Sequence, residues 1–156
     1  MARINPEYVA RIQTTFRASP YPAHMSMTLD ALDRGSCTIA LEIKPEHFQP
    51  FGVVHGGVLA TLIDTATFWA AFLSLERPDD GMASVDLKLN YLAPVFGGKL
   101  VATGRQLHRG KRLSYTEAHV LNIGERGEQL VAHGTSTLMA LPGKGIALDI
   151  PRELGS

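Results

Sequence analysis

The residues best suited to chemistry lie between Gln49 and Asp64, where two glycines open a long apolar run that contains one carboxylate. Gly56 and Gly57 stand at the predicted start of a helix. First-turn amides of a helix have no partner inside it, and the helix dipole adds positive potential there. Such a helix start suits a carbonyl oxygen that gains negative charge. A tight turn that needs glycine for its conformation would explain the same two residues.

Asp64 is the second feature, because a lone carboxylate in a buried apolar helix carries a large desolvation cost. No lysine or arginine lies within one turn of it, and Thr61 and Thr65 are expected near its face of the helix. Buried acids are usually paired or functional. We therefore favour a catalytic carboxylate over an acid that is satisfied by hydrogen bonds from a neighbouring loop.

The spacing of Gly57 and Asp64 limits what one chain can do. Seven residues place both on the same helix face but about 10 Å apart along the axis, so they cannot both contact one carbonyl group. Two such helices packed antiparallel across a two-fold axis would bring Gly57 of one chain to Asp64 of the other. The spacing therefore predicts self-association, as a dimer or as a tetramer of two dimers, with a composite site.

The elements that must position these residues follow from hydrophobic periodicity. Residues 56–76 are apolar nearly all round and predict one long buried helix. Alternating patterns predict a hairpin before this helix and three or four strands after it. An antiparallel sheet must cover its apolar face, and the long helix is the element able to do so. The expected fold class is α+β, with a curved antiparallel β-sheet wrapped around one long central helix. The predicted strands are 25–32, 36–43, 84–91, 100–107, 113–122 and 130–141.

The 156 residues indicate a single core, flanked by two short segments. Residues 1–24 are expected to form an N-terminal helix, capped by Asn5, and a linker broken at 19–22. Residues 25–141 form the predicted domain. Residues 142–156 show no strong pattern and are expected to be a loose tail.

Composition excludes several classes of protein. Fifteen basic residues balance fifteen acidic ones, which argues against bulk capture of nucleic acid or of an acidic membrane. Residues 58–75 are apolar enough to suggest a membrane span, but Asp64 inside them would be costly in lipid. Cys37 is the only cysteine and no signal peptide is visible, so a cytoplasmic protein is expected. The histidines show no metal-ligand spacing, and no metal site is expected.

A known family shares the main motif. His55, Gly56 and Gly57, with Asp64 nine residues after the histidine, resemble the PaaI-like thioesterases of the hotdog-fold superfamily. The segment 84–91 also fits that pattern. The resemblance covers about residues 45–140 and implies hydrolysis of an acyl-CoA thioester to a free acid and coenzyme A. It implies no separate cofactor, because coenzyme A is part of the substrate.

The resemblance also implies roles for matching residues. Asp64 would be the catalytic carboxylate, as general base or as nucleophile, and the Gly57 amide would contact the thioester oxygen. His55 would help to hold the loop and the thioester, and Ser84 would help Asp64 to position water. Gln49 occupies a position that is often asparagine in PaaI-like members, so its role in orienting water or the leaving thiol is an open question.

The coenzyme A contacts are expected in part from the one basic cluster, because three cations on a loop suit a phosphorylated ligand. A solvated hairpin tip would explain the same cluster. The candidate contacts are Gly56, Asn90, Arg109, Lys111 and Arg112.

Two other functions stay open. A hotdog dehydratase or hydratase acting on acyl thioesters would place its histidine and acid differently. A non-catalytic acyl-CoA sensor would leave Asp64 without an evident purpose. The identity of the acyl group is also open between aryl, short-chain and medium-chain groups.

Overall fold

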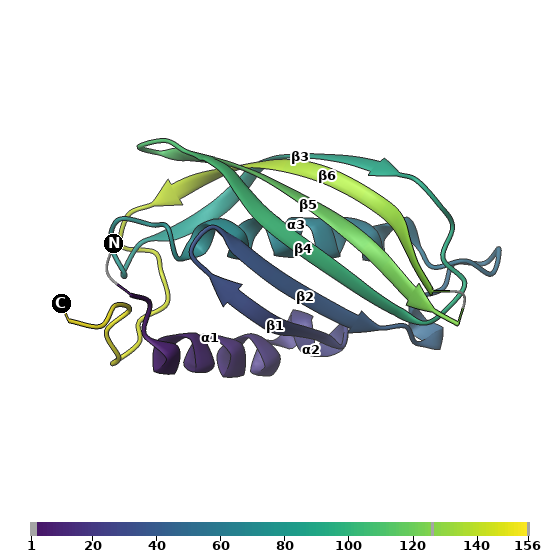
Figure 1. Cartoon of the computed structure of the whole chain (residues 1–156), viewed down its shortest axis with the longest axis horizontal. Helices are drawn as coiled ribbons and strands as arrows, with labels where there is room; N and C mark the ends of the chain where they lie inside the picture. Colours follow the sequence, from purple (N-terminus) through teal and green to yellow (C-terminus); the bar gives the residue numbers. More distant parts are fainter. Residues whose placement is uncertain (1–2, 126, 156) are drawn as a thin grey trace.

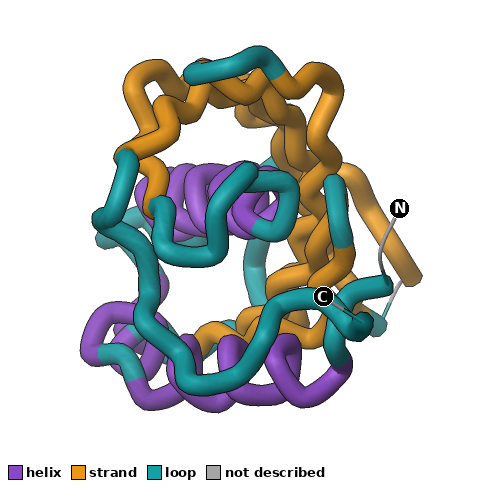
Figure 2. Tube along the Cα trace, turned by 90° about the vertical axis from the view of Figure 1, so that its left-hand side faces the viewer, coloured by secondary structure: helices purple, strands orange, loops and turns teal. Residues whose placement is uncertain are grey.

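One curved sheet encloses the long helix α3 (Gly56–Phe72) in the computed structural model, which describes residues 3–125 and 127–155. Figure 2 shows α3 inside the curve of the strands, with the N-terminal helix α1 (Pro6–Ala18) below it. The remaining positions are 1 and 2 of the predicted N-terminal segment, 126 between the predicted strands 113–122 and 130–141, and 156 of the predicted tail. They lie outside the described residues.

The sheet has six strands in the order β1-β2-β4-β5-β6-β3, and each strand is antiparallel to its neighbours (Figure 1). β3 leaves α3 and runs along the far edge of the sheet, where it pairs with the last strand. This arrangement confirms the expected α+β fold with a curved antiparallel sheet around one helix. The strands are β1 (Met27–Asp33), β2 (Ser36–Glu42), β3 (Gly81–Tyr91), β4 (Lys99–Arg109), β5 (Leu113–Gly124) and β6 (Gly127–Leu141).

The core forms where α3 lies on the concave face of the sheet. Leu62, Ile63 and Ala66 of α3 are wholly buried. Gly104 of β4 allows this close approach, because a Cβ atom on it would lie 2.2 Å from the carbonyl oxygen of Ala66. No helix among the described residues is long and apolar enough to span a membrane.

The helix α3 ends at Phe72, four residues before the predicted end at 76. Leu73 and Leu75 are both buried, with 0% and 7% of their surfaces exposed. The buried apolar run therefore continues past the last residue of the helix into the turn that follows it. The prediction that this apolar segment is buried is confirmed, whereas the prediction that the helix continues to residue 76 is wrong.

The N-terminal segment contains two helices. Asn5 caps α1 as predicted, its side chain accepting a hydrogen bond from the amide of Glu7 at 3.0 Å. The predicted break is confirmed at Ser19, where the backbone is extended and α1 ends. The expected linker after it is wrong, because α2 (Pro20–His24) forms a short second helix there. Proline at the first position of a helix loses no hydrogen bond and has a suitable φ, so Pro20 begins this helix without cost.

The C-terminal segment is packed, contrary to the expectation of a loose tail. Ile146, Leu148 and Ile150 pack against the core. Farther on, the carbonyl oxygen of Arg152 accepts a hydrogen bond from the amide of Asn5 at 2.9 Å. Residues 142–155 carry no helix or strand, and their position comes from these contacts with the N-cap of α1 and the core.

Candidate active site

Ser84 and Asp64 meet between β3 and α3. The Ser84 hydroxyl donates a hydrogen bond to Oδ1 of Asp64 at 2.7 Å. A β-bulge follows Ser84, between its position and that of Asp86 in the register with β6. The bulge breaks the alternation of β3 where the strand passes the helix.

Asp64 is half-buried, which corrects the expectation of a carboxylate inside the core. It lies on the side of α3 that the sheet leaves uncovered, with the half-buried Thr61 and Thr65. The desolvation argument therefore overstated the burial of this group within one chain. The position still leaves one carboxylate oxygen on an accessible face, while Ser84 holds the other.

His55 caps the start of α3. Its Nδ1 atom accepts a hydrogen bond from the backbone amide of Gly57 at 2.8 Å. An accepting Nδ1 places the ring hydrogen of neutral imidazole on Nε2. The imidazole therefore accepts the hydrogen bond of the Gly57 amide, which the sequence predicts to contact a carbonyl oxygen.

Tyr91 was not assigned a role in the site from the sequence, but it covers the first turn of the helix. Its hydroxyl donates to the carbonyl oxygen of Gly56 at 3.3 Å. A Cβ atom on Gly56 would lie 3.3 Å from the Tyr91 ring. Glycine at this position thus leaves room for the aromatic ring beside the helix start.

Gln49 holds its own loop. Its Oε1 atom accepts a hydrogen bond from the amide of Phe51 at 2.6 Å, and its backbone pairs with Val53 and Gly52. The side chain is half-buried. In this conformation the amide group organises the loop before His55, and its oxygen is already engaged.

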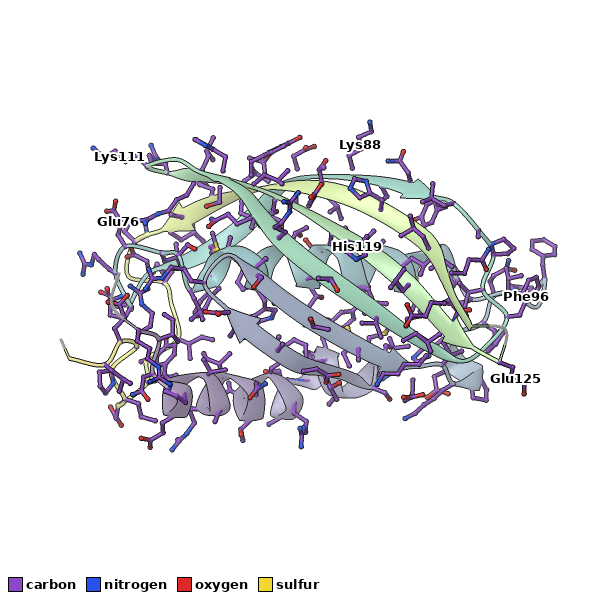
Figure 3. All side chains as sticks on the ribbon, in the orientation of Figure 1. Glu76, Lys88, Phe96, Lys111, His119 and Glu125 are labelled. Carbon is purple, nitrogen blue, oxygen red and sulfur yellow. The ribbon has the colours of Figure 1, made fainter. Side chains whose placement is uncertain are left out.

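The candidate coenzyme A contacts lie apart from one another. Arg109 pairs with Glu76 at 3.5 Å, so the basic turn that includes Lys111 and Arg112 lies beyond the C-terminal end of α3. In Figure 3, Lys111 and Glu76 lie at one end of the molecule and Phe96 at the other. This turn is therefore far from the helix start within one chain.

Asn90 lies on a different surface again. It is exposed and stands opposite His133 in the register of β3 with β6. Ser84 stands opposite the buried Leu138 in the same ladder. Residues that stand opposite each other in a ladder point to the same face of the sheet, so Ser84 shares the core face with Leu138. The extra residue at the bulge reverses the alternation after Ser84. Asn90, six positions farther on, therefore points to the face away from the core.

A cavity of about 230 Å³ adjoins Asp64, and its lining includes Phe68 and Trp69. These aromatic residues of the apolar run suggest core packing, with a place in an acyl pocket as the alternative. The cavity lies between α3 and the N-terminal helices, with Phe16 and Tyr21 on one side and Trp69 on the other. The hydroxyl of Tyr21, which lines the cavity, shares a hydrogen bond of 2.7 Å with the hydroxyl of Thr61 on α3. The sequence places Thr61 near the face of Asp64, but it predicts a linker at 19–22, where Tyr21 contacts Thr61.

The Cys37 thiol and a bound metal ion are two other possible sources of reactivity. Burial raises the pKa of the Cys37 thiol to about 12, so this residue is protonated near neutral pH and is a poor nucleophile. Within residues 3–125 and 127–155, no cluster of three or more histidine, cysteine or acidic side chains could hold a metal ion. The chemistry of the described site therefore depends on Asp64 and its neighbours.

Comparison with known proteins decides the family. The thioesterase superfamily profile matches residues 51–128, which contain both Asp64 and Ser84. The chain belongs to the thioesterase superfamily. This confirms the predicted relationship and places the chain among enzymes that hydrolyse thioesters.

Two relatives and one solved structure illustrate the match. Human acyl-coenzyme A thioesterase 13 is 32% identical over 71% of this chain and 77% of its own length. The 1,4-dihydroxy-2-naphthoyl-CoA hydrolase of Listeria monocytogenes is 30% identical over 69% of this chain and 85% of its own. A thioesterase family protein from Silicibacter pomeroyi superposes with a TM-score of 0.79 at 27% identity, covering 86% of this chain and 98% of the other. The likeness extends to the hotdog fold as a whole.

Proposed function

We propose that this chain hydrolyses an acyl-CoA thioester to a free acid and coenzyme A. The observation that carries the proposal is the 2.7 Å hydrogen bond from Ser84 to Asp64, on an accessible helix face beside an apolar cavity. The names of the human and Listeria relatives, a coenzyme A thioesterase and a coenzyme A ester hydrolase, support the same substrate class.

In the proposed mechanism Asp64 is a general base. Ser84 holds Oδ1, which leaves Oδ2 to accept a proton from a water molecule. The water oxygen adds to the thioester carbon, and a first-turn amide of α3 stabilises the negative charge on the carbonyl oxygen. The carbon–sulfur bond then breaks, and the coenzyme A thiolate leaves and takes up a proton.

The site is composite in this proposal. Gly57 and Asp64 are separated by about two turns of α3, roughly 10 Å, so the amide and the base come from different chains. The edge strand β3 supports association, because its apolar side chains Val85, Leu87 and Tyr91 are 53%, 37% and 56% exposed. An exposed apolar edge strand is a template for pairing with a second chain.

The basic turn fits the same arrangement. Arg109 lies near the C-terminal end of α3, where it pairs with Glu76. Antiparallel packing of two α3 helices would set this end beside the helix start of the partner. Lys111 and Arg112, both exposed, would then be available to the phosphates of coenzyme A bound at that helix start.

The direct test is thiol release from a panel of acyl-CoAs by wild type and by Asp64→Asn. We expect turnover of at least one ester and a loss of at least about a hundredfold in the variant, or about 2.7 kcal/mol of transition-state stabilisation. A folded wild type that hydrolyses none of the panel would refute the proposal. Label on the Asp64 carboxylate after a single turnover in ¹⁸O-labelled water would demonstrate a nucleophilic route, because it requires an anhydride that water opens at the Asp64 carbon.

A further inference from the structure

The cavity beside Asp64 is built largely by the N-terminal segment. Thr15 and Phe16 of α1 and Tyr21 of α2 contribute one wall, and Thr65 of α3 lies with Asp64 on the other. The core thioesterase profile begins at residue 51, so this wall lies outside the matched region. The segment before the sheet therefore shapes the space next to the proposed base.

The inner end of the cavity is apolar and firmly packed. Phe16 and Trp69 are 3% and 8% exposed, and their rings meet edge to face at 5.9 Å. Phe68 packs edge to face on Trp69 at 5.4 Å. Such buried aromatic contacts resist rearrangement, so they give the cavity a rigid apolar wall.

The outer wall is fastened to the helix that carries Asp64. Tyr21 of α2 and Thr61 of α3 share a 2.7 Å hydrogen bond, and Pro22 lines the cavity beside Tyr21. Thr61 lies three residues before Asp64, about one helical turn away. The short helix α2 is thus held in place next to the proposed reaction centre.

We propose that this cavity receives the acyl group and that residues 15–22 limit its size. An apolar cavity of about 150 Å³ holds a benzene molecule. At about 230 Å³, this cavity suits a compact acyl group, such as a single substituted ring or a chain of up to roughly eight carbons. Long-chain acyl groups exceed it. The inference rests on the proposed function, because it places the thioester carbon at Asp64.

The test compares two tryptophan substitutions at neighbouring threonines. Thr15 lines the cavity, whereas Thr14 is exposed and bonds only to the carbonyl oxygen of Ala10, at 3.0 Å. Thr15→Trp should fill the cavity, and Thr14→Trp should leave it open. The measurement is kcat/KM for straight-chain acyl-CoAs from acetyl to palmitoyl, with melting temperatures as a check on folding.

We expect wild type to prefer acyl chains of up to roughly eight carbons over palmitoyl. Thr15→Trp should lower the ratio of octanoyl to acetyl kcat/KM by at least about tenfold, while Thr14→Trp should leave it unchanged. If Thr15→Trp does not fold, Phe16→Leu serves instead, and its enlarged cavity should move the preference to longer chains.

The outcomes separate the two proposals. If wild type hydrolyses acyl-CoAs but Thr15→Trp and Phe16→Leu keep its chain-length profile, the cavity assignment is overturned and the proposed function stands. A preference of wild type for palmitoyl would also overturn the assignment. If wild type hydrolyses none of these esters, the proposed function fails and the cavity assignment fails with it.

Discussion

Nδ1 of His55 accepts the amide hydrogen of Gly57 at 2.8 Å, so the amide proposed to bind the thioester oxygen has a partner within its own chain. A carbonyl oxygen that takes this hydrogen must displace the imidazole. His55 thus has two tasks, because it caps α3 in the free protein and would contact the thioester after moving.

These tasks can be separated by substitution of His55. His55→Ala removes the cap and should lower the free energy of unfolding by about 0.5–2 kcal/mol. His55→Asn offers a new capping oxygen and should recover most of this stability. If the imidazole also holds the thioester, both variants should lose kcat/KM. Urea unfolding and thiol release measure the two effects, and full activity in His55→Asn would restrict His55 to capping.

A composite site predicts rescue when two inactive variants are mixed. Asp64→Asn removes the base. Gly57→Pro removes the amide hydrogen, and with it the 2.8 Å bond to His55, so the melting temperature of each variant is measured first as a check on folding. A mixed dimer contains one site with both groups intact. Random exchange of subunits should therefore restore about a quarter of wild-type activity.

The control for this rescue is each variant put through the same unfolding and refolding alone, which should stay inactive. An inactive mixture, after mixed dimers have been detected by mass spectrometry, would contradict a site shared between chains. Full activity of a monomeric wild type would contradict it as well.

The fold could be predicted because its main signals are local. The apolar run of α3 and the alternation of the strands after it are properties of neighbouring residues, and they gave the element order correctly. The end of α3 could not be predicted, because Leu73 and Leu75 continue its apolar run and are buried in the same core. The packed tail after residue 141 has the same explanation.

The site could be predicted only in part. The resemblance suggested that Ser84 lies near Asp64, and the structure gives the bond between them. The half-buried state of Asp64 was not predicted, because apolar composition does not reveal which face of a helix the sheet leaves uncovered. The contact of Tyr21 with Thr61 joins residues forty positions apart, and no local pattern in the sequence indicates it.

Packing of α3 on the sheet predicts a strong effect at Gly104. Gly104→Ala would place a Cβ atom 2.2 Å from the carbonyl oxygen of Ala66, so the helix or strand must shift. We expect a loss of about 1–3 kcal/mol in the free energy of unfolding. Gly124→Ala is the matched control, because no atom lies within 4 Å of its added Cβ. Equal urea midpoints for the two variants would show that the close approach has no energetic importance.

The buried thiol of Cys37 predicts a loss of stability in alkali. Its pKa is raised from 9.0 to about 12 by burial, so between these values the unfolded chain releases a proton that the native chain keeps. Stability contributed by this group is complete below pH 9 and falls as pH rises through that window. At about pH 10.5 the loss should be about 2 kcal/mol.

Cys37→Ala isolates this contribution, because all other titrating groups are shared with wild type. The difference in unfolding free energy between wild type and variant should shrink by that amount from pH 8 to about pH 10.5. A difference that does not change with pH would mean that the thiol titrates equally in both states.

The strand order has a consequence for biosynthesis. β3 is made directly after α3, but its ladder partner β6 is the last strand of the chain. Until Gly127–Leu141 has left the ribosome, β3 has no paired strand to hold Ser84 against Asp64. Pairings of this kind, distant in sequence, close slowly. The reactive pair is therefore completed late, so a nascent chain should acquire its catalytic geometry only after β6 has been synthesised.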